Sequence, residues 1–326
     1  MIGVITGTGS YVPKKIVDNN DLSQIMDTND EWIRERTGIV RRHVVQEEST
    51  VSMATEAAKR ALEDAKVNAE DLDMIIVSTI SSDVVLPATA CEVQKNIGAT
   101  KAVCFDLSAA CTGFLFALNT AQAYFHAGVV KKVLLVGAES LSSIVDWSDR
   151  GSAILFGDGA GAAVLEAGEG EFPTMVMHSD GFKGEALRAK TPIAGRRYND
   201  ENLEQDEKDT FIAMNGQEVF KFAVRKVPEC LEELLEKSGK SLEDVDYFIL
   251  HQANQRIVES IAKRLKTDIE KFPMNLMEYG NTSSASIPIL LDELNKNGTL
   301  KKGMQLAVAG FGAGLSWGAT WIEWQR

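Results

Sequence analysis

NAEDLDMIIVST (residues 68–79) and SLEDVDYFILHQ (residues 241–252) are two versions of one sequence pattern. Each version has Glu-Asp, an aliphatic residue, Asp and then four largely apolar residues. Glu70 in the first corresponds to Glu243 in the second, at an offset of 173 residues. The two segments therefore predict that the chain contains a duplicated structural unit.

The same offset relates two further pairs of segments. RALE at 60–63 aligns with ELLE at 233–236, and VLLVG at 133–137 aligns with LAVAG at 306–310. Three matches in one register are hard to attribute to chance.

The repeated segments alternate between strand and helix patterns. The runs MIIVST, VLLVGA, YFILH and LAVAG are short and continuously apolar, which is typical of strands buried on both faces. Residues 53–65 and 228–237 have apolar positions at helical spacing. This alternation predicts an α/β fold of stacked layers with two pseudo-symmetric halves, 1–170 and 171–326.

The composition is that of an ordinary globular protein with an acidic balance. The 326 residues are 44% hydrophobic and 25% charged, with a formal net charge of −13. This charge argues against a general nucleic-acid binder, because phosphate binding needs a basic face. We expect no signal peptide, and no membrane span, since no run approaches about 18 apolar residues. The cysteines have no zinc-type spacing, and we expect them to be reduced thiols in the cytoplasm: Cys91, Cys104, Cys111 and Cys230.

One of these cysteines stands where a helix is expected to begin. DLSAACTGFLFAL (residues 106–118) places Cys111 before an apolar run that predicts a buried helix. The repeat offset pairs Cys111 with Ser284 in the polar loop NTSSAS. Because pseudo-symmetric halves usually meet through equivalent elements, we expect the cysteine helix and the loop after Asn281 to converge.

A histidine and an asparagine join this cysteine as candidate catalytic residues. His251 ends a buried strand, and loops at the carboxyl ends of strands build sites in α/β sheets. Each residue alone has an ordinary structural explanation: a packed cysteine, a satisfied histidine and an asparagine cap. Together, in a duplicated fold, Cys111, His251 and Asn281 predict a Cys-His-Asn site.

At these motifs the chain resembles the thiolase superfamily and, within it, the β-ketoacyl-[acyl-carrier-protein] synthase III family. The resemblance covers essentially the whole chain and implies a duplicated thiolase-like fold with α-β-α-β-α layers. It also implies a condensing acyltransferase that starts fatty-acid synthesis and forms a homodimer. The motifs that carry it are DTNDEWIRERTGI (27–39), DLSAACTGF (106–114), DWSDRGSAILFGDGAGAAVL (146–165), HQANQRI (251–257), YGNTSSASIP (279–288) and GFGAGLSWG (310–318).

The resemblance implies that Cys111 attacks a short acyl-CoA, acetyl or branched, and keeps the acyl group. A helix N-terminus favours a thiolate, so we expect a lowered thiol pKa. Malonyl-acyl-carrier protein then loses CO₂, and His251 and Asn281 bind the enolate oxygen. Backbone N–H groups of Cys111 and Ala313 form the oxyanion hole, and no metal or redox cofactor is needed. The family's Phe-Gly-Gly-Gly turn reads Phe311-Gly312-Ala313-Gly314 here, so Ala313 serves only if its φ is negative.

Further residues occupy the family's substrate-contact positions. Trp32 and Arg150 are expected to stack on the adenine of CoA, and Arg36 to reach a phosphate. Gly216 and Gln217 correspond to the pantetheine tunnel, although the family often has Asn where Gln217 stands. A surface tryptophan with solvated arginines is the alternative for Trp32, Arg36 and Arg150.

The remaining predictions concern the acyl group and the carrier protein. Leu141 and Phe156 resemble the lining of the acyl pocket, with Leu86 contributed by a dimer partner; plain core packing is the alternative. Arg256, on the helix after HQAN, matches a position that docks the carrier protein. The polar segment 184–211 is expected to be a surface loop, and a lid over the tunnel is a second possibility.

Four other functions compete with this one. A biosynthetic thiolase should have a second cysteine near the C-terminal glycine turn, but none follows Cys230. A chalcone-type polyketide synthase usually has a longer chain, whereas a starter-loading ketosynthase of a polyketide or other specialised pathway stays open. A non-catalytic acyl-CoA binder that keeps the fold tends to lose a member of the triad, and this chain retains all three.

Overall fold

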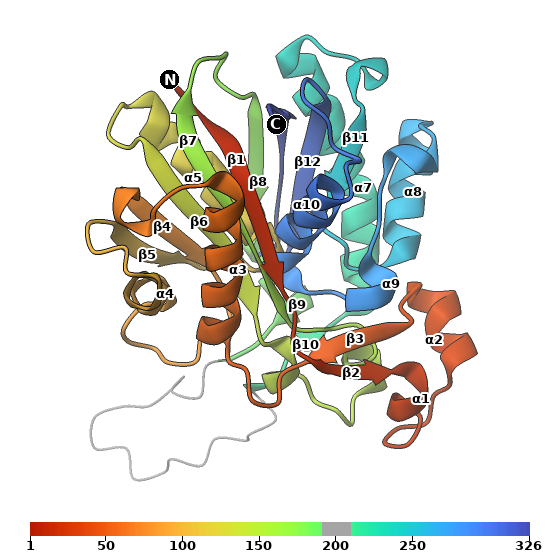
Figure 1. Cartoon of the computed structure of the whole chain (residues 1–326). Coiled ribbons are helices and arrows are strands. Elements are labelled where there is room, and N and C mark those ends of the chain that lie inside the picture. Colours follow the sequence, from red (N-terminus) through yellow and green to blue (C-terminus); the bar gives the residue numbers. More distant parts are fainter. Residues whose placement is uncertain (191–209) are drawn as a thin grey trace.

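Two mixed β-sheets form the frame of the molecule in the computed structural model, which describes residues 1–190 and 210–326 (Figure 1). The first sheet is antiparallel at β1, β7 and β6 and parallel from β6 through β4 to β5. Its strands are, in spatial order, β1 (Ile2–Tyr11), β7 (Gly159–Gly168), β6 (Lys132–Glu139), β4 (Met74–Ser78) and β5 (Val103–Leu107). The second sheet consists of β11 (Tyr247–Leu250), β12 (Gln305–Gly312), β13 (Ser316–Glu323) and β8 (Met175–Ser179).

The repeat found in the sequence is visible in the strand positions. In the first sheet, β4 and β6 are adjacent and parallel, and in the second sheet β11 and β12 have the same relation. Strand β6 spans residues 132–139 and β12 spans 305–312, so both ends of the strand keep the offset of 173 residues. The predicted duplicated α/β fold is confirmed. The division at residues 170 and 171 stays a prediction; the first sheet ends in sequence at Gly168 and the second begins at Met175.

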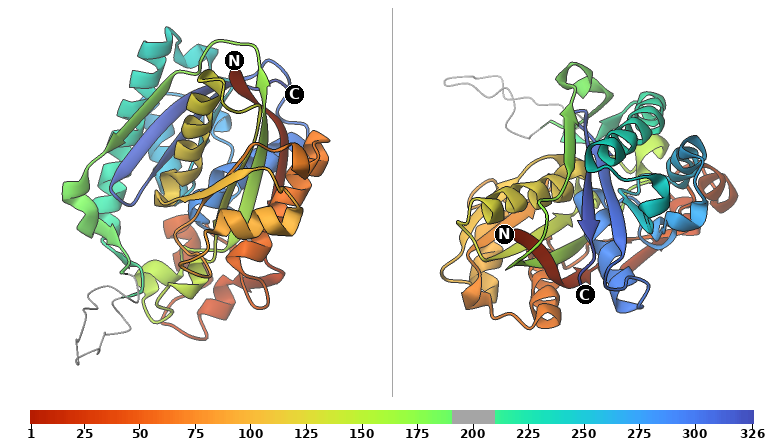
Figure 2. Two further views of the ribbon diagram at one scale, coloured as in Figure 1. Left: turned by 90° about the vertical axis from the view of Figure 1, so that its left-hand side faces the viewer. Right: turned by 90° about the horizontal axis from the view of Figure 1, so that it is seen from above.

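Helices form the other layers, and Figures 1 and 2 show them on both sides of each sheet. α3 and α4 pack on the outer face of the first sheet, α7 and α8 cover the outer face of the second, and α5 and α10 contact both sheets. The order of layers is therefore α-β-α-β-α, as predicted. These helices are α3 (Thr50–Ala65), α4 (Thr89–Ile97), α5 (Gly113–His126), α7 (Gly216–Ser238), α8 (Gln255–Leu265) and α10 (Ser286–Lys296).

Two predicted helices are longer than the sequence pattern indicated. The first begins at Thr50 because the Ser49 hydroxyl caps it by accepting the N–H of Ser52. The second begins at Gly216 and continues through Pro228, where the predicted segment started. Proline lacks an N–H and usually marks a helix boundary, so the helical pattern was read only from that point.

Several short elements lie around the sheets, and one of them corrects a prediction. Segment 184–211 was expected to be a surface loop, but Leu187–Arg188 forms strand β9, which pairs with β10 (Ala213–Met214). Residues 191–209 lie outside the described residues, so the lid stays a prediction. The other short strands and α-helices are β2 (Lys15–Asp18), β3 (Arg41–Val44), α1 (Asn19–Leu22), α2 (Asp30–Thr37), α6 (Arg150–Ala153) and α9 (Leu276–Tyr279).

The central layer is the most deeply buried part of the fold. Phe114, Leu118 and Phe125 of α5 pack with Ile287 and Leu290 of α10 between the two sheets. Burying one such side chain contributes about 1.5–3 kcal/mol to folding. The N-termini of α5 and α10 are therefore held firmly against each other. No helix within residues 1–190 and 210–326 is long and apolar enough to cross a membrane.

Candidate active site

A cavity of about 510 Å³ lies where the two halves meet, and it contains the three predicted catalytic residues. Cys111, His251 and Asn281 all line it, although they are far apart in the sequence. Its volume is in the usual range of small-molecule sites. Five further predicted residues line the same cavity: Trp32, Arg36, Phe156, Gly216 and Gln217. Arg256 lines it too.

Cys111 lies in a 3₁₀ turn, Ala110–Thr112, directly before α5. An equivalent turn, Ser283–Ala285, precedes α10, and the two turns are in contact. Ala110 and Ser283 occupy the same place in the repeat, and both have positive φ, 45° and 49°. Non-glycine residues adopt this conformation only where their surroundings hold them in it. The two turns therefore converge at the site, as the repeat predicted.

The ionisation of Cys111 differs from the expectation. Burial raises the pKa of the thiol to about 12, and the negative charge of Glu139 adds to the rise. The Ser283 side chain and the N–H of Cys111 itself lower this pKa, but by less than burial raises it. The pKa is raised rather than lowered as expected, because desolvation by burial is the largest influence on it. The resting nucleophile is a neutral thiol.

His251 directly follows β11, and its N–H donates to the carbonyl of Ala309 in β12 over 2.8 Å. Its Nδ1 lies 2.8 Å from Oγ of Ser286, which also accepts the N–H of Gln252 at 3.4 Å. Since this hydroxyl already accepts one hydrogen bond, it can donate its own hydrogen to Nδ1. When Ser286 Oγ donates to Nδ1, the imidazole carries its proton on Nε2. Burial lowers the pKa of His251 to about 3, so the ring is neutral.

Asn281 is fixed through both its backbone and its side chain. Its backbone bridges to the chain around Phe156: the N–H donates to Leu155 O over 2.8 Å, and the carbonyl accepts from Gly157 over 3.0 Å. The side-chain Oδ1 accepts the N–H of Ser283 at 2.9 Å. With Oδ1 engaged, Nδ2 is the free end of the amide and carries two donor hydrogens.

The glycine turn after β12 lies directly against the nucleophile. A Cβ added at Gly312 would be 2.8 Å from Cβ of Cys111 and 3.2 Å from its Sγ. Ala313 lines a different cavity, of about 670 Å³, rather than the one that holds the triad. Ala313 is not among the described non-glycine residues with positive φ, so it meets the requirement of a negative φ at this position. Its role in an oxyanion hole stays a prediction.

The predicted CoA-binding residues form a cluster around one aromatic ring. The guanidinium carbons of Arg36 and Arg150 each lie 4.5 Å from the centre of the Trp32 ring. Arg150 does not line the cavity, and its Nη1 donates to the carbonyl of Asp27 over 2.8 Å. A planar group can enter between Trp32 and Arg150 only if this guanidinium shifts. The cluster nevertheless combines a flat aromatic surface with two positive charges.

The predicted acyl-pocket residues divide into three places. Phe156 lines the cavity. Leu141 is fully buried and packs in the same cluster as Phe156, but it does not reach the cavity wall. Leu86 is 83% exposed and lies outside the cavity, so its contribution to a partner subunit stays a prediction. Met214, Val219 and Phe220, which belong to the segment 214–222 that resembles the tunnel lining, also line the cavity, and sequence reasoning did not single out Ile154, Leu155 and Leu187.

A buried carboxylate near the nucleophile was also missed. Glu139 ends β6 and is fully buried; it accepts hydrogen bonds from Ser81 Oγ at 2.6 Å, Ser284 Oγ at 2.9 Å and the N–H of Ile80 at 3.1 Å. Burial raises its pKa. The sequence contained one indication of this contact. Ser284, which donates to Glu139, is the residue that corresponds to Cys111 in the repeat.

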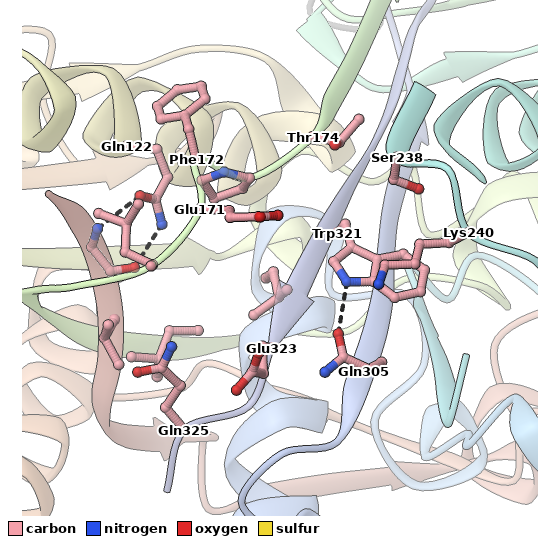
Figure 3. Close-up of a pocket in the computed structure, with 17 residues that line it drawn as sticks. Gln122, Glu171, Phe172, Thr174, Ser238, Lys240, Gln305, Trp321, Glu323 and Gln325 are labelled. Carbon is pink, nitrogen blue, oxygen red and sulfur yellow. Dashed lines mark hydrogen bonds between the residues drawn. The ribbon is translucent and has the colours of Figure 1, made fainter. Parts of the chain in front are cut away.

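A third cavity, of about 250 Å³, lies elsewhere on the seam between the sheets (Figure 3). Figure 3 shows Trp321 donating to Gln305, over 2.8 Å, with Lys240 beside the Trp321 ring. None of the predicted site residues lines it. Within residues 1–190 and 210–326, no group of three or more His, Cys, Asp or Glu side chains could hold a metal ion.

Comparison with known proteins gives consistent matches over the whole chain. The model of the 3-oxoacyl-[acyl-carrier-protein (ACP)] synthase III family matches residues 105–181, and the model of its C-terminal part matches residues 235–324. A β-ketoacyl-[acyl-carrier-protein] synthase III from Clostridium acetobutylicum is 48% identical over 323 residues, which are 99% of this chain and 98% of the relative. One from Clostridium botulinum (strain Loch Maree) is 50% identical over 98% of each chain.

Solved structures agree. The 3-oxoacyl-[acyl-carrier-protein] synthase III of Aquifex aeolicus superposes with a TM-score of 0.91 at 43% identity, over 98% of this chain and 99% of that one. The priming β-ketosynthase of the R1128 polyketide pathway superposes with a TM-score of 0.93 at 33% identity, over 100% and 97% of the two chains. These superpositions confirm the predicted thiolase-like fold.

Proposed function

The chain belongs to the 3-oxoacyl-[acyl-carrier-protein] synthase III family, and on that basis we propose that it starts fatty-acid synthesis. It condenses a short acyl-CoA primer with malonyl-acyl-carrier protein to give a β-ketoacyl-acyl-carrier protein. One observation carries this proposal: a single cavity leads from Trp32 and Arg36 to Cys111, His251 and Asn281. That cavity offers a nucleophile and two neutral hydrogen-bond donors, which are the groups that a decarboxylative condensation requires.

The first half-reaction loads the primer on Cys111. The sulfur attacks the acyl-CoA carbonyl carbon, a new thioester forms, and the bond to the CoA sulfur breaks. Because the resting thiol is neutral, its proton must leave during attack, and it ends on the CoA sulfur. The backbone N–H groups of Cys111 and Ala313 stabilise the tetrahedral oxyanion. Each such donor contributes on the order of 10²–10³ in rate.

The second half-reaction makes the carbon nucleophile. When malonyl-acyl-carrier protein loses CO₂, the electron pair of the broken C–C bond becomes an enolate, whose charge lies on the thioester oxygen. Nε2–H of His251 and Nδ2–H of Asn281 bind that oxygen. Both donors are pre-oriented, His251 by Ser286 and Asn281 by the N–H of Ser283. The enolate carbon then attacks the acyl group, and Cys111 leaves as a thiolate, which takes a proton from water to restore the resting thiol.

Substrate recognition follows from the entrance of the cavity. Arg36 and Arg150 bind the phosphates and adenine of CoA with Trp32, and Gly216 and Gln217 line the pantetheine path. Arg256 lies on α8, 5.9 Å from the ring of Phe220, and docks the acidic carrier protein. All the groups named in these steps are protein atoms, so the reaction proposed here takes no cofactor.

The active form is proposed to be a cytoplasmic homodimer. Strand β5 is an edge of the first sheet among the described residues, and an unpaired edge strand is a place where a second chain can add. Val103 on this strand is 62% exposed, and Val85 and Leu86 are 79% and 83% exposed. We propose that a second copy covers this surface and contributes its Leu86 to the acyl pocket of the first.

A starter-loading ketosynthase of a polyketide pathway is the second candidate. The TM-score of 0.93 with the R1128 priming ketosynthase supports it, because the two chains share the whole fold. The relatives at 48–50% identity favour fatty-acid synthesis instead. The two functions use the same residues and differ in the acyl group that is loaded.

Separate assays of the two half-reactions test the proposal. Acyl transfer from a panel of acyl-CoA primers is measured alongside decarboxylation of malonyl-acyl-carrier protein. Cys111→Ala should abolish transfer and keep decarboxylation, whereas Asn281→Ala should do the opposite. Arg256→Glu should weaken only the carrier-protein step. Formation of β-ketoacyl product by Cys111→Ala would refute the mechanism, and a clear preference for an unusual primer would favour the polyketide alternative.

A further inference from the structure

The Ser283 hydroxyl is a buried polar group without a hydrogen-bond partner among the described residues. The residue is 2% exposed, and its backbone is held at a φ of 49°. A buried hydroxyl that makes no hydrogen bond costs about 1–3 kcal/mol of stability. We therefore asked which group this hydroxyl could bind during the reaction.

Its two serine neighbours on the same loop are already engaged. Ser284 Oγ lies 2.9 Å from each of two acceptors, the carbonyl oxygen of Ser78 and Oε1 of Glu139. Ser286 Oγ is hydrogen-bonded to Nδ1 of His251. The N–H of Ser283 is also used, since it orients Asn281. Among the serines at 283, 284 and 286, only Ser283 has a buried hydroxyl without a partner among the described residues.

The position of this hydroxyl points to the sulfur of Cys111. Its 3₁₀ turn packs against the turn that carries the nucleophile. Burial raises the pKa of both Cys111 and Glu139, and the Ser283 hydroxyl opposes the rise in each. The Ser283 turn packs against both the Cys111 turn and β6, which ends at Glu139, while its hydroxyl has no partner among the described residues.

The proposed reaction places negative charge on this sulfur twice. The thiol must lose its proton when Cys111 attacks the primer, and Cys111 leaves as a thiolate when the condensation product departs. His251 and Asn281 direct their donors at the enolate oxygen instead. Cys111 is buried, at 7% exposure, so water stabilises a charge on its sulfur poorly.

We propose that Ser283 is a further catalytic residue, whose hydroxyl donates a hydrogen bond to the Cys111 sulfur whenever that sulfur is negatively charged. This inference rests on the proposed function. Ser283 keeps its proton throughout: in loading the thiol proton goes to the CoA sulfur, and in condensation the C–S bond breaks with its electrons on Cys111. The residue acts as an electrostatic donor rather than as an acid or base.

The test is the rate at which iodoacetamide alkylates Cys111, followed from pH 7 to pH 10. Ser283→Gly removes the hydroxyl and accepts a positive φ without strain, and Ser283→Ala removes the same group with a side chain retained. Because only the thiolate reacts, loss of a donor to a charged group should slow alkylation about tenfold at fixed pH. Ser238→Ala removes a serine hydroxyl away from the catalytic cavity, so it is the control and should alkylate like the wild type.

A second measurement separates catalysis from support of the loop. Malonyl-acyl-carrier protein decarboxylation is compared in Cys111→Ala and in the Cys111→Ala/Ser283→Gly double variant, where it should be equal. Unchanged alkylation in both Ser283 variants would overturn the proposal. So would a parallel fall in decarboxylation, since Asn281 would then be displaced. Alkylation uses neither CoA nor carrier protein, so failure of the proposed function alone would leave the Ser283 effect intact.

Discussion

The Ser286 hydroxyl oxygen lies 2.8 Å from Nδ1 of His251 and accepts the N–H of Gln252 on its other side. The serine is five positions beyond Asn281, on the loop that also fixes the Asn281 amide. One short segment of the C-terminal half therefore orients both donors of the proposed enolate site. This coupling explains why the site can be rigid although its three residues come from distant parts of the sequence.

Ser286→Ala should impair decarboxylation selectively. Without the hydroxyl, the imidazole can carry its proton on Nδ1 and present a bare Nε2 to the enolate oxygen. We expect malonyl-acyl-carrier protein decarboxylation to fall about tenfold, and acyl loading on Cys111 to change little. Ser286→Thr should restore most of the activity. Equal losses in both half-reactions, or no rescue by threonine, would contradict this role.

Gly312→Ala should block the nucleophile. The added methyl group would lie 3.2 Å from Sγ of Cys111 and 2.8 Å from its Cβ, closer than side chains pack. Since displacement by about 1 Å can cost on the order of 100-fold in rate, acyl loading should fall by at least that factor. Gly181→Ala is the control, because no atom lies within 4 Å of its added Cβ. Loading at the wild-type rate in Gly312→Ala would show that the turn is not held against Cys111.

Trp32→Leu should weaken the binding of CoA thioesters. In the proposed complex this ring stacks on the adenine of CoA, and stacking of a base on an aromatic ring contributes about 1–3 kcal/mol. We expect the KM for acyl-CoA to rise about 5- to 150-fold while kcat for loading is kept. Tyr11→Leu is the control. The Tyr11 ring also packs against an arginine, Arg60, but it lies away from the cavity, so this variant should leave KM unchanged. A fall in kcat with constant KM would mean that Trp32 supports the catalytic residues.

His251 should make the protein sensitive to acid. Burial lowers its folded-state pKa to about 3, below the ordinary 6.5. Between these values the unfolded chain binds a proton that the folded protein excludes, so stability is lost as the pH falls. Relative to His251→Asn, the wild-type free energy of unfolding should drop by about 1.4 kcal/mol per pH unit between pH 6 and pH 4. Urea titrations at several pH values measure this difference, and a pH-independent difference would exclude a buried neutral histidine.

The repeat made much of the architecture predictable. An offset read from three short segments anticipated strand β12 from β6 and the meeting of the Cys111 and Ser283 turns. This worked because buried parallel strands leave continuous apolar runs, which are readable without tertiary information. The helix before Pro228 was missed, since proline is the usual sign of a helix boundary.

The chemistry of the site was less predictable. Sequence motifs pointed to Cys111, His251 and Asn281. The side chains that orient these residues or change their pKa values reach them through contacts between distant parts of the fold. Ser286, Ser283 and Glu139 act through such contacts, and a serine in a polar loop has no pattern that reveals its partner. The thiol pKa was misjudged for the same reason, because helix position is visible in sequence whereas desolvation is not.

The most direct test is to find where the acyl group is carried. The protein is incubated with labelled acetyl-CoA and isobutyryl-CoA in separate samples, digested, and analysed by mass spectrometry. The account predicts an acyl adduct on the peptide that contains Cys111, its absence in Cys111→Ala, and its disappearance with formation of β-ketoacyl product when malonyl-acyl-carrier protein is added. Product formation without an adduct on Cys111, or an adduct that malonyl-acyl-carrier protein does not discharge, would contradict it.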